Sequence, residues 1–361
     1  MKLVLAALLS GAAAAAQAQN PPLERIQLPP GFRIEVLASV PNARSLALGA
    51  KGTLFVGSRS GGAVHAVAPG GKVSRIADGM SMPNGVAFKD GTLYIAEVGK
   101  IFSMEGIESN LQAPAKPRLV YDKLPSDVHH GWKFIRFAPD GRLTIPIGAP
   151  CNVCDRDGYA QIGFLDLKTK EFQTHARGVR NTVGFDWHPQ TRELWFTDNG
   201  RDWLGDELPA DELNHAPRAG MHFGFPYCHQ GDLPDPEFGR GRKCSEFQAP
   251  AQKLGPHVAA LGMRFYTGSM FPAEYRNQIF IAEHGSWNRS KKSGYRISLV
   301  KIEGSKVISY QPFAQGWLQG ESGKENPWGR PVDLEILPDG SLAVSDDSAG
   351  LIYRISFSGP R

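Results

Sequence analysis

Two adjacent histidines, His129 and His130, stand directly before Gly131. An imidazole can accept a proton near neutral pH, which makes histidine a common general base in enzymes. Glycine carries no Cβ and lets a ligand approach the backbone closely. A single histidine is often structural, but this pattern predicts that His130 is a general base and that His129 orients or flanks it.

Three arginines, Arg44, Arg180 and Arg330, come at the start of similar apolar runs in different parts of the chain. A guanidinium group matches a carboxylate because it can donate two parallel hydrogen bonds to it. One such arginine would usually be a solvated surface residue. Three at corresponding positions predict that the protein binds an anionic ligand.

The densest acidic stretch of the sequence is residues 198–214, which also contains an amide side chain and several glycines. Carboxylate, amide and carbonyl oxygens are the ligands that calcium prefers. The spacing is not that of an EF-hand. The stretch therefore indicates either a calcium site or a solvated loop in which Asp206 or Asp211 caps a turn.

A repeat connects these residues. Each unit has two short apolar runs with alternating polarity joined by a turn, and the turn contains Asp-Gly in three of the six units. Repeated hairpins of this kind are typical of blades arranged around an axis. The sequence predicts an all-β fold, a six-bladed β-propeller with four-stranded blades and loop insertions. The units are residues 44–57, 84–96, 132–145, 181–197, 262–282 and 330–345.

In a propeller, the starts of the first strands and the ends of the following strands line a funnel around the axis. Polar residues occupy these positions in the repeat, and convergence of polar groups on a rigid scaffold predicts a small-molecule site. The starts are Arg44, Asn84, His129, His130, Arg180, Asn181 and Arg330, and the ends are Arg59, Glu97, Asp198, Asn199, Glu283, His284, Asp346 and Asp347.

The N-terminal segment has the pattern of an export signal. A positive charge precedes a short apolar stretch, and Ala-Gln-Ala at positions 16–18 matches a small-x-small cleavage site. We expect residues 1–18 to be a signal peptide and residues 19–361 to form one exported propeller domain, in the periplasm or secreted. No later stretch is apolar enough to cross a bilayer, so we expect no membrane insertion.

The overall composition excludes two other classes of protein. The chain is 41% hydrophobic, which is too much for a disordered protein. Its 40 basic residues are interspersed with 36 acidic residues, and a net charge of +4 gives no reason to expect nucleic acid as a partner.

Export affects the interpretation of the four cysteines. In an oxidising compartment they are expected to form disulfides, Cys151 with Cys154 and Cys228 with Cys244. Asp155 follows the first pair where a covalently bound haem would require histidine, so c-type haem is excluded. A four-cysteine zinc site is an alternative, but the second pair is spaced too widely for a zinc ribbon.

On these features the chain resembles the glucose/sorbosone dehydrogenase family, and most of all its sorbosone dehydrogenase branch. The family's members are exported six-bladed propellers that use pyrroloquinoline quinone (PQQ) and calcium. The similarity extends over nearly the whole mature chain. It is carried by His130 with residues 134–141, residues 178–181, residues 198–200 with Asp206 and Glu207, residues 223–226, residues 283–289 and residues 330–333.

The resemblance also implies a role for each matching residue. An acidic residue that precedes the family's catalytic histidine is His129 here, and a proline of the calcium loop is Arg201. The implied roles are His130 as catalytic base, Arg180 as a catalytic contact to substrate, Asn181, Arg289, Lys292 and Arg330 as cofactor ligands, and the backbone carbonyls of Gly200 and Arg201 as calcium ligands.

The expected reaction is oxidation of a sugar or sugar aldehyde by hydride transfer to PQQ, with an electron acceptor as a further partner. One alternative is a metal-dependent lactonase or other hydrolase on the same propeller, with Asn84, Asn181 and Asp198 among its ligands. That alternative leaves the arginines unexplained. Another is a propeller that binds a sugar or peptide without catalysis.

Overall fold

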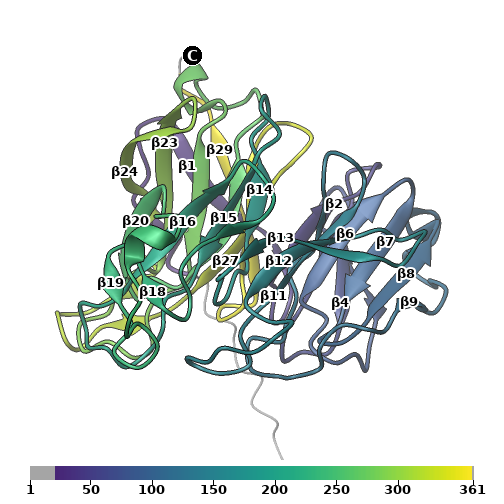
Figure 1. The fold of residues 1–361 in the computed structure, drawn as a ribbon. Helices are drawn as coiled ribbons and strands as arrows, with labels where there is room; N and C mark the ends of the chain where they lie inside the picture. Colours follow the sequence, from purple (N-terminus) through teal and green to yellow (C-terminus); the bar gives the residue numbers. More distant parts are fainter. Residues whose placement is uncertain (1–20, 360–361) are drawn as a thin grey trace, which may run out of the picture.

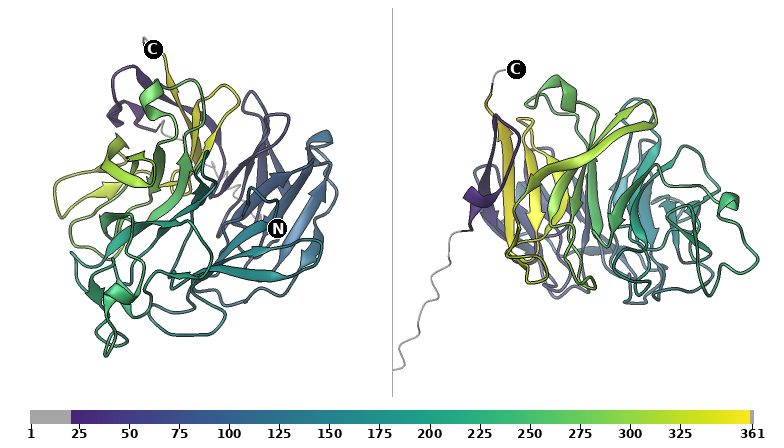
Figure 2. Two further views of the ribbon diagram at one scale, coloured as in Figure 1. Left: turned by 45° about the horizontal axis from the view of Figure 1, so that its top comes forward. Right: turned by 90° about the vertical axis from the view of Figure 1, so that its left-hand side faces the viewer.

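The computed structural model describes residues 21–359, so the expected signal peptide lies outside the described residues. Six sheets of four or five strands lie side by side in a ring (Figures 1 and 2). This arrangement confirms the predicted all-β, six-bladed propeller. Among residues 21–359, no helix is long and apolar enough to cross a membrane.

The first three blades follow one another along the chain, and each is an antiparallel meander. The third gains a fifth strand, β17 (Met221–His222), parallel to β13. The first blade contains β2 (Leu46–Leu48), β3 (Leu54–Val56), β4 (Val64–Val67) and β5 (Val73–Ala77). The second contains β6 (Gly85–Lys89), β7 (Thr92–Ala96), β8 (Ile101–Glu105) and β9 (Arg118–Tyr121), and the third contains β10 (Arg136–Phe137), β11 (Leu143–Ile147), β12 (Gln161–Leu165) and β13 (Phe172–Arg177).

The other three blades contain the larger insertions. Two short hairpins lie outside the blades, β18 (Cys228–His229) with β19 (Leu233–Pro234) and β25 (Leu318–Gln319) with β26 (Asn326–Pro327). The blade strands are β14 (Phe185–Trp187), β15 (Leu194–Asp198), β16 (Ala210–Ala216) and β20 (Gln252–Pro256); β21 (Ala260–Phe265), β22 (Ile279–Glu283), β23 (Arg296–Glu303) and β24 (Lys306–Gln315); β27 (Pro331–Ile336), β28 (Leu342–Asp346), β29 (Leu351–Phe357) and β1 (Phe32–Ser39).

Four short 3₁₀ helices complete the secondary structure of residues 21–359. They are η1 (Leu23–Arg25), η2 (Ile107–Ser109), η3 (Cys244–Glu246) and η4 (Ala273–Tyr275).

The hairpin between β6 and β7 shows how the sequence specifies a blade. Lys89 pairs with Thr92, so only Asp90 and Gly91 form the turn. Both have positive φ, 48° and 77°, as a two-residue turn that follows the strand twist requires. The Asp-Gly pair therefore sets the register that turns the apolar side chains of both strands to the same face.

The ring is closed by the two ends of the chain. Strand β1, the first in sequence, pairs antiparallel with β29, the last, from Phe32 opposite Phe357 to Ser39 opposite Leu351 (Figure 1). The ring of Phe32 also packs edge-on against Phe271 at 4.8 Å. Closure thus combines a backbone ladder with aromatic packing onto the neighbouring blade.

Ion pairs between buried and half-buried side chains link the blades near the axis. Arg136 of β10 pairs with Glu335 of β27 at 2.9 Å and with Asp186 of β14 at 3.5 Å. Arg264 of β21 reaches the same Glu335 at 3.3 Å. These ion pairs join four different blades and fix their inner strands relative to one another.

Both expected disulfides are present and confirm the predicted pairing. Cys151 is bonded to Cys154 and Cys228 to Cys244, with Cα atoms 6.1 and 5.5 Å apart. The four cysteines are therefore not available as zinc ligands.

Candidate active site

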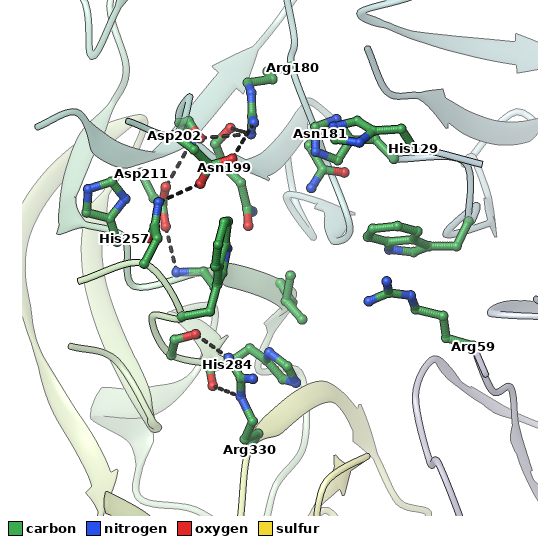
Figure 3. A pocket seen from close by; sticks show the side chains of 18 of the residues that line it. Arg59, His129, Arg180, Asn181, Asn199, Asp202, Asp211, His257, His284 and Arg330 are labelled. Atoms are coloured by element: carbon green, nitrogen blue, oxygen red, sulfur yellow. Dashed lines mark hydrogen bonds and ion pairs between the residues drawn. The ribbon is translucent and has the colours of Figure 1, made fainter. Parts of the chain in front are cut away.

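A cavity of about 690 Å³ opens at one end of the ring (Figure 3). Its lining comes from strand starts and strand ends of several blades, as the repeat predicts, together with two insertions. Charged and aromatic side chains dominate it: Arg44, Arg59, His129, His130, Trp132, Arg180, Asn181, Asn199, Asp202, Asp211, His257, His284, Trp287, Asn288 and Arg330, with the backbone of Gly200.

His130 is held in the tautomer that a general base needs. Its Nδ1 lies 2.9 Å from the carbonyl oxygen of Ala149. Because a carbonyl can only accept, Nδ1 carries the hydrogen and the lone pair of the neutral ring is on Nε2. Burial, and then the charges of Arg180 and His129, hold the pKa of His130 well below 6.5. The ring is therefore neutral at pH 7 and ready to accept a proton.

The backbone around His130 is shaped for this position. His130 itself has φ of +49°, in the left-handed region. A Cβ at Gly148 would lie 2.7 Å from the Cβ of His130, so this close approach requires glycine. The ring of His129 lies 4.1 Å from that of His130, and no carboxylate within residues 21–359 is hydrogen-bonded to either ring. The orienting group is thus the carbonyl of Ala149, in place of an acidic neighbour.

Arg180 is fully engaged by the protein. Its Nε donates to the carbonyl of Asn152 at 2.8 Å and one Nη2 hydrogen to the side chain of the same residue at 2.9 Å. Nη1 donates to the carbonyls of Asn199 and Gly200 at 3.2 and 2.8 Å, and Nη2 also reaches Asp202 at 3.0 Å. All five N–H groups are used, so Arg180 offers a ligand its charge but no free donor.

Asp198 shapes the turn that carries the Arg-Asn pair. Its two carboxylate oxygens accept the backbone N–H groups of Arg180 and Asn181, at 2.8 and 2.6 Å. Burial raises the pKa of Asp198 to about 7. The residue therefore positions Arg180 and Asn181, both of which line the cavity, and does not line it itself.

The wall near Arg180 has the chemistry of a cation site. Asn199, Gly200, Asp202 and Asp211 line it with amide, carbonyl and carboxylate oxygens, the donors that calcium prefers. Within residues 21–359, no three histidine, cysteine, aspartate or glutamate side chains converge as a metal centre. A bound cation would therefore depend on backbone carbonyls, which fits the implied role of Gly200.

Two buried carboxyl groups of this region, Asp211 and Glu212, hold their protons more strongly than free carboxyl groups do. Burial raises the pKa of Asp211 to about 6, and burial together with Asp198 raises that of Glu212 to about 8. Asp211 also accepts the backbone N–H of Gly200 at 2.8 Å, which fixes the loop. The oriented oxygens of this loop make the donor set suitable for a divalent cation.

Arg201 contributes only backbone to this region. Its side chain is buried outside the cavity lining and pairs with Asp235 at 2.5 Å and Glu237 at 3.4 Å. The expected role of its carbonyl as a calcium ligand stays a prediction.

The opposite side of the cavity is cationic. Arg330 donates from Nε to the carbonyl of His284 at 3.0 Å and from Nη2 to the carbonyl of Gly285 (Figure 3). No other acceptor in the described part of the chain takes up its remaining guanidinium N–H groups, so they are available to a ligand. The guanidinium of Arg59 lies 4.0 Å over the ring of Trp132. Cations beside an aromatic face suit a flat anionic ligand.

Two of the expected cofactor ligands are not brought to the cavity. Arg289 donates to the carbonyl of Asp206 at 2.9 Å and pairs with Glu207, so it fastens one loop to another. Lys292 is half-buried and does not line the cavity either. Of the eight expected site residues, the cavity joins His130, Arg180, Asn181, Gly200 and Arg330.

Several cavity residues were not among the expected site residues. The sequence predicts that Arg59 and His284 line the funnel because they stand at strand ends of the repeat, although it assigns no role to them. His257 follows the insertion ahead of β21, where no repeat signal exists. Trp132 begins a repeat unit but looks like an ordinary apolar residue in the sequence.

Comparison with known families adds an independent line of evidence. The family described as Glucose / Sorbosone dehydrogenase matches residues 156–286, and the family described as TrAA12-like matches residues 234–358. The two matched ranges together contain His284, Arg330 and the oxygen-rich wall of the cavity, which is formed by Asn199, Gly200, Asp202 and Asp211.

Two relatives show different degrees of similarity. An uncharacterized protein of Borreliella burgdorferi is 35% identical over 349 residues, which covers 92% of this chain and 91% of that protein. The PQQ-dependent pyranose dehydrogenase of Coprinopsis cinerea is 32% identical over 129 residues, or 31% of this chain and 17% of that enzyme.

Solved structures share the fold across nearly the whole chain. The calcium structure of a Trichoderma reesei enzyme of carbohydrate-active family AA12 superposes with a TM-score of 0.81 at 19% identity, covering 95% of this chain and all of that one. The holo PQQ domain of the Coprinopsis cinerea pyranose dehydrogenase gives 0.76 at 18% identity, covering 92% and 97%. With the family match and the full-length relative, the chain belongs to the glucose/sorbosone dehydrogenase family.

Proposed function

We propose that this protein is a PQQ-dependent sugar dehydrogenase, which oxidises a sugar or a hydrated sugar aldehyde of the aldose or sorbosone type. The observation that carries the proposal is the neutral His130, with Nε2 unprotonated, in one cavity with the cationic side chains of Arg59 and Arg330. Family membership and the pyranose dehydrogenase activity in the name of a relative support the same reaction class.

In this reaction His130 accepts the hydroxyl proton of the sugar at Nε2. The Nδ1–H bond to Ala149 keeps the ring oriented while it gains charge. Burial and the charge of Arg180 lower the pKa of His130, which favours release of the proton after the reaction. Arg180 thus positions the carbonyls of Asn199 and Gly200, and its charge acts on the base.

Arg330 and Arg59, on the cationic side of the cavity, would hold the carboxylates of the cofactor. Arg330 and Arg59 have guanidinium donors left for a ligand, and the aromatic rings of Trp132, which lies against Arg59, and Trp287 also line the cavity. The carbonyls of Gly200 and Arg201 would hold calcium. When bound, PQQ supplies a hydride-accepting quinone and calcium polarises its carbonyl.

We further propose that the protein acts outside the cytoplasm. Two disulfides support an oxidising compartment, as does the export pattern of the sequence. Its other partner would be an electron acceptor, either a quinone or a cytochrome.

The hydrolase alternative has less support. Asn84 is fully buried and its amide donates to Ser45 and to the carbonyl of Lys133, so it cannot reach a metal in the cavity. Asp198 is occupied by two backbone N–H groups. Two of its three expected ligands are thus committed elsewhere.

The test is reconstitution of the purified protein with PQQ and calcium, followed by sugars and an artificial electron acceptor. We expect sugar-dependent reduction of the acceptor that requires PQQ. The His130→Gln protein is the control, because it keeps a polar side chain of similar length without a base. Lactone hydrolysis without PQQ, and no sugar oxidation, would favour the alternative.

A further inference from the structure

A second histidine of the cavity is held by a carboxylate. His284 follows β22, and its Nε2 lies 2.7 Å from Oδ1 of Asp347, which follows β28. The other oxygen of Asp347 accepts a hydrogen bond from Nη1 of Arg44 at 2.6 Å. Since an ionised carboxylate can only accept, Nε2 carries the hydrogen and Nδ1 of the neutral ring is bare.

This arrangement is anchored in the interior. Arg44 is buried, and its Nε donates to Oδ1 of Asn84 at 2.7 Å. The amide of Asn84 in turn donates to Ser45 at 3.0 Å and to the carbonyl of Lys133 at 2.8 Å. The hydrogen-bonded chain from His284 to Lys133 therefore joins five blades and holds the carboxylate of Asp347 in place.

His284 and His130 approach the cavity from different blades. His284 lies beside Arg330, on the side of the cavity away from Arg180 (Figure 3). Each of the two imidazoles has one nitrogen committed to an acceptor, a backbone carbonyl for His130 and a carboxylate for His284. The cavity thus contains two oriented proton acceptors.

The proposed reaction releases two protons, one in each half-reaction. Oxidation of an alcohol to a carbonyl compound releases two electrons and two protons. The hydroxyl proton goes to His130, and the second hydrogen leaves carbon as hydride together with both electrons. When these electrons pass to two equivalents of a one-electron acceptor, that second hydrogen is released as a proton.

We propose that His284, oriented by Asp347, is the second proton acceptor of the cavity and takes the proton released when the electrons leave. The inference rests on the proposed function. His284 is thereby a catalytic residue of the half-reaction with the acceptor, while His130 serves the half-reaction with the sugar.

The charges that face His284 fit such a role. They are Asp347 in direct contact, with Arg330 and Arg44 nearby. Burial and the two arginines lower the pKa of His284 to about 4, against the opposing effect of Asp347. A ligand carboxylate bound to Arg330 would offset part of the charge of the two arginines and raise the pKa of His284 toward 7.

The first test separates the two half-reactions by steady-state kinetics. In His284→Gln the ion pair of Arg44 with Asp347 stays in place. We expect kcat/KM for the acceptor to fall about 10²-fold, the scale of a lost acid–base group, and kcat/KM for the sugar to be unchanged. The matched control is His215→Gln, because His215 also pairs with a carboxylate, Glu193 at 3.0 Å, but does not line the cavity. An equal fall of both parameters, or of neither, overturns the proposal.

The second test is independent of turnover. Nitrogen NMR of histidine-labelled protein should show His284 with hydrogen on Nε2 and a bare Nδ1, and its pKa should rise when PQQ is added. Hydrogen on Nδ1 overturns the proposal whatever the activity. If the wild type oxidises no sugar, the proposed function is wrong, and the NMR result still decides whether His284 is an oriented proton acceptor.

Discussion

Nη1 of Arg180 lies 2.8 Å from the carbonyl oxygen of Gly200, the oxygen implied as a calcium ligand. A carbonyl oxygen has two lone pairs, so one can serve the arginine and the other a cation. Arg180 thus orients the carbonyl of Gly200. The position of the expected calcium site therefore depends on a guanidinium group whose five N–H groups all donate to the protein.

Replacing this guanidinium tests its positioning role. Arg180→Lys keeps the charge but cannot reach Asn152, Asn199, Gly200 and Asp202 together. We expect a loss of about 3 kcal/mol in the free energy of unfolding, as for breaking a buried ion pair, and weaker calcium binding. Urea denaturation and calcium titration measure the two effects. Unchanged calcium affinity in the folded variant would contradict the role.

His130 and Arg330 should separate chemistry from cofactor binding. His130→Ala should lower turnover about 10²- to 10⁴-fold because the base is lost, and leave PQQ affinity nearly unchanged. Arg330→Ala should weaken PQQ binding, with turnover partly restored at saturating PQQ. Single-turnover kinetics and PQQ titration provide the measurements. Parental turnover in His130→Ala would remove the base from the mechanism.

The buried carboxylates predict how stability depends on pH. The pKa values of Asp198 and Glu212 are raised to about 7 and about 8, so the folded state binds more protons than the unfolded state between about pH 4 and pH 8. Stability without calcium should therefore fall as pH rises through this window. Calcium should reduce the fall and raise the melting temperature, since it binds the folded loop. Thermal melts in chelator and in calcium compare the two, and identical curves would contradict the cation site.

The two disulfides should differ in what they support. Cys228 and Cys244 are 16 residues apart, and replacing both by serine should cost about 3 kcal/mol of stability. Cys151 and Cys154 close a much shorter loop that carries Asn152, an acceptor for Arg180. Replacing Cys151 and Cys154 by serine should lower calcium affinity more than the Cys228/Cys244 replacement does, and should lower the free energy of unfolding less. Calorimetry and calcium titration of both double variants distinguish these outcomes.

The sequence predicts what the repeat controls. Hairpins such as the one at Asp90 and Gly91 depend on local turn chemistry, and strand ends locate residues such as His130 and Arg330 at the cavity. The partners of those residues depend on contacts distant in sequence. The carboxylate of Asp198, for example, looks like a metal ligand in the sequence, but it accepts two backbone N–H groups.

Insertions escape prediction for the same reason. Arg289 carries the charge expected of a cofactor ligand, but the loop at Asp206 and Glu207 takes up its donors. His257 reaches the cavity from an irregular segment and is held by the carbonyl of Gly205 at 2.8 Å. Neither arrangement follows a period in the sequence, so only the folded chain reveals it.

The pairing of β1 with β29 also determines the order in which the molecule can be completed. Synthesis from the N-terminus produces β1 before any other blade strand, and its partner only among the last residues. Until then β1 has no strand partner within its blade, and the ladder that it must form with β29 closes a loop of more than 300 residues. The last blade, which also carries Asp347, is therefore the last to become complete. A chain interrupted late in synthesis would have most of its blades but would lack the pair of His284 with Asp347.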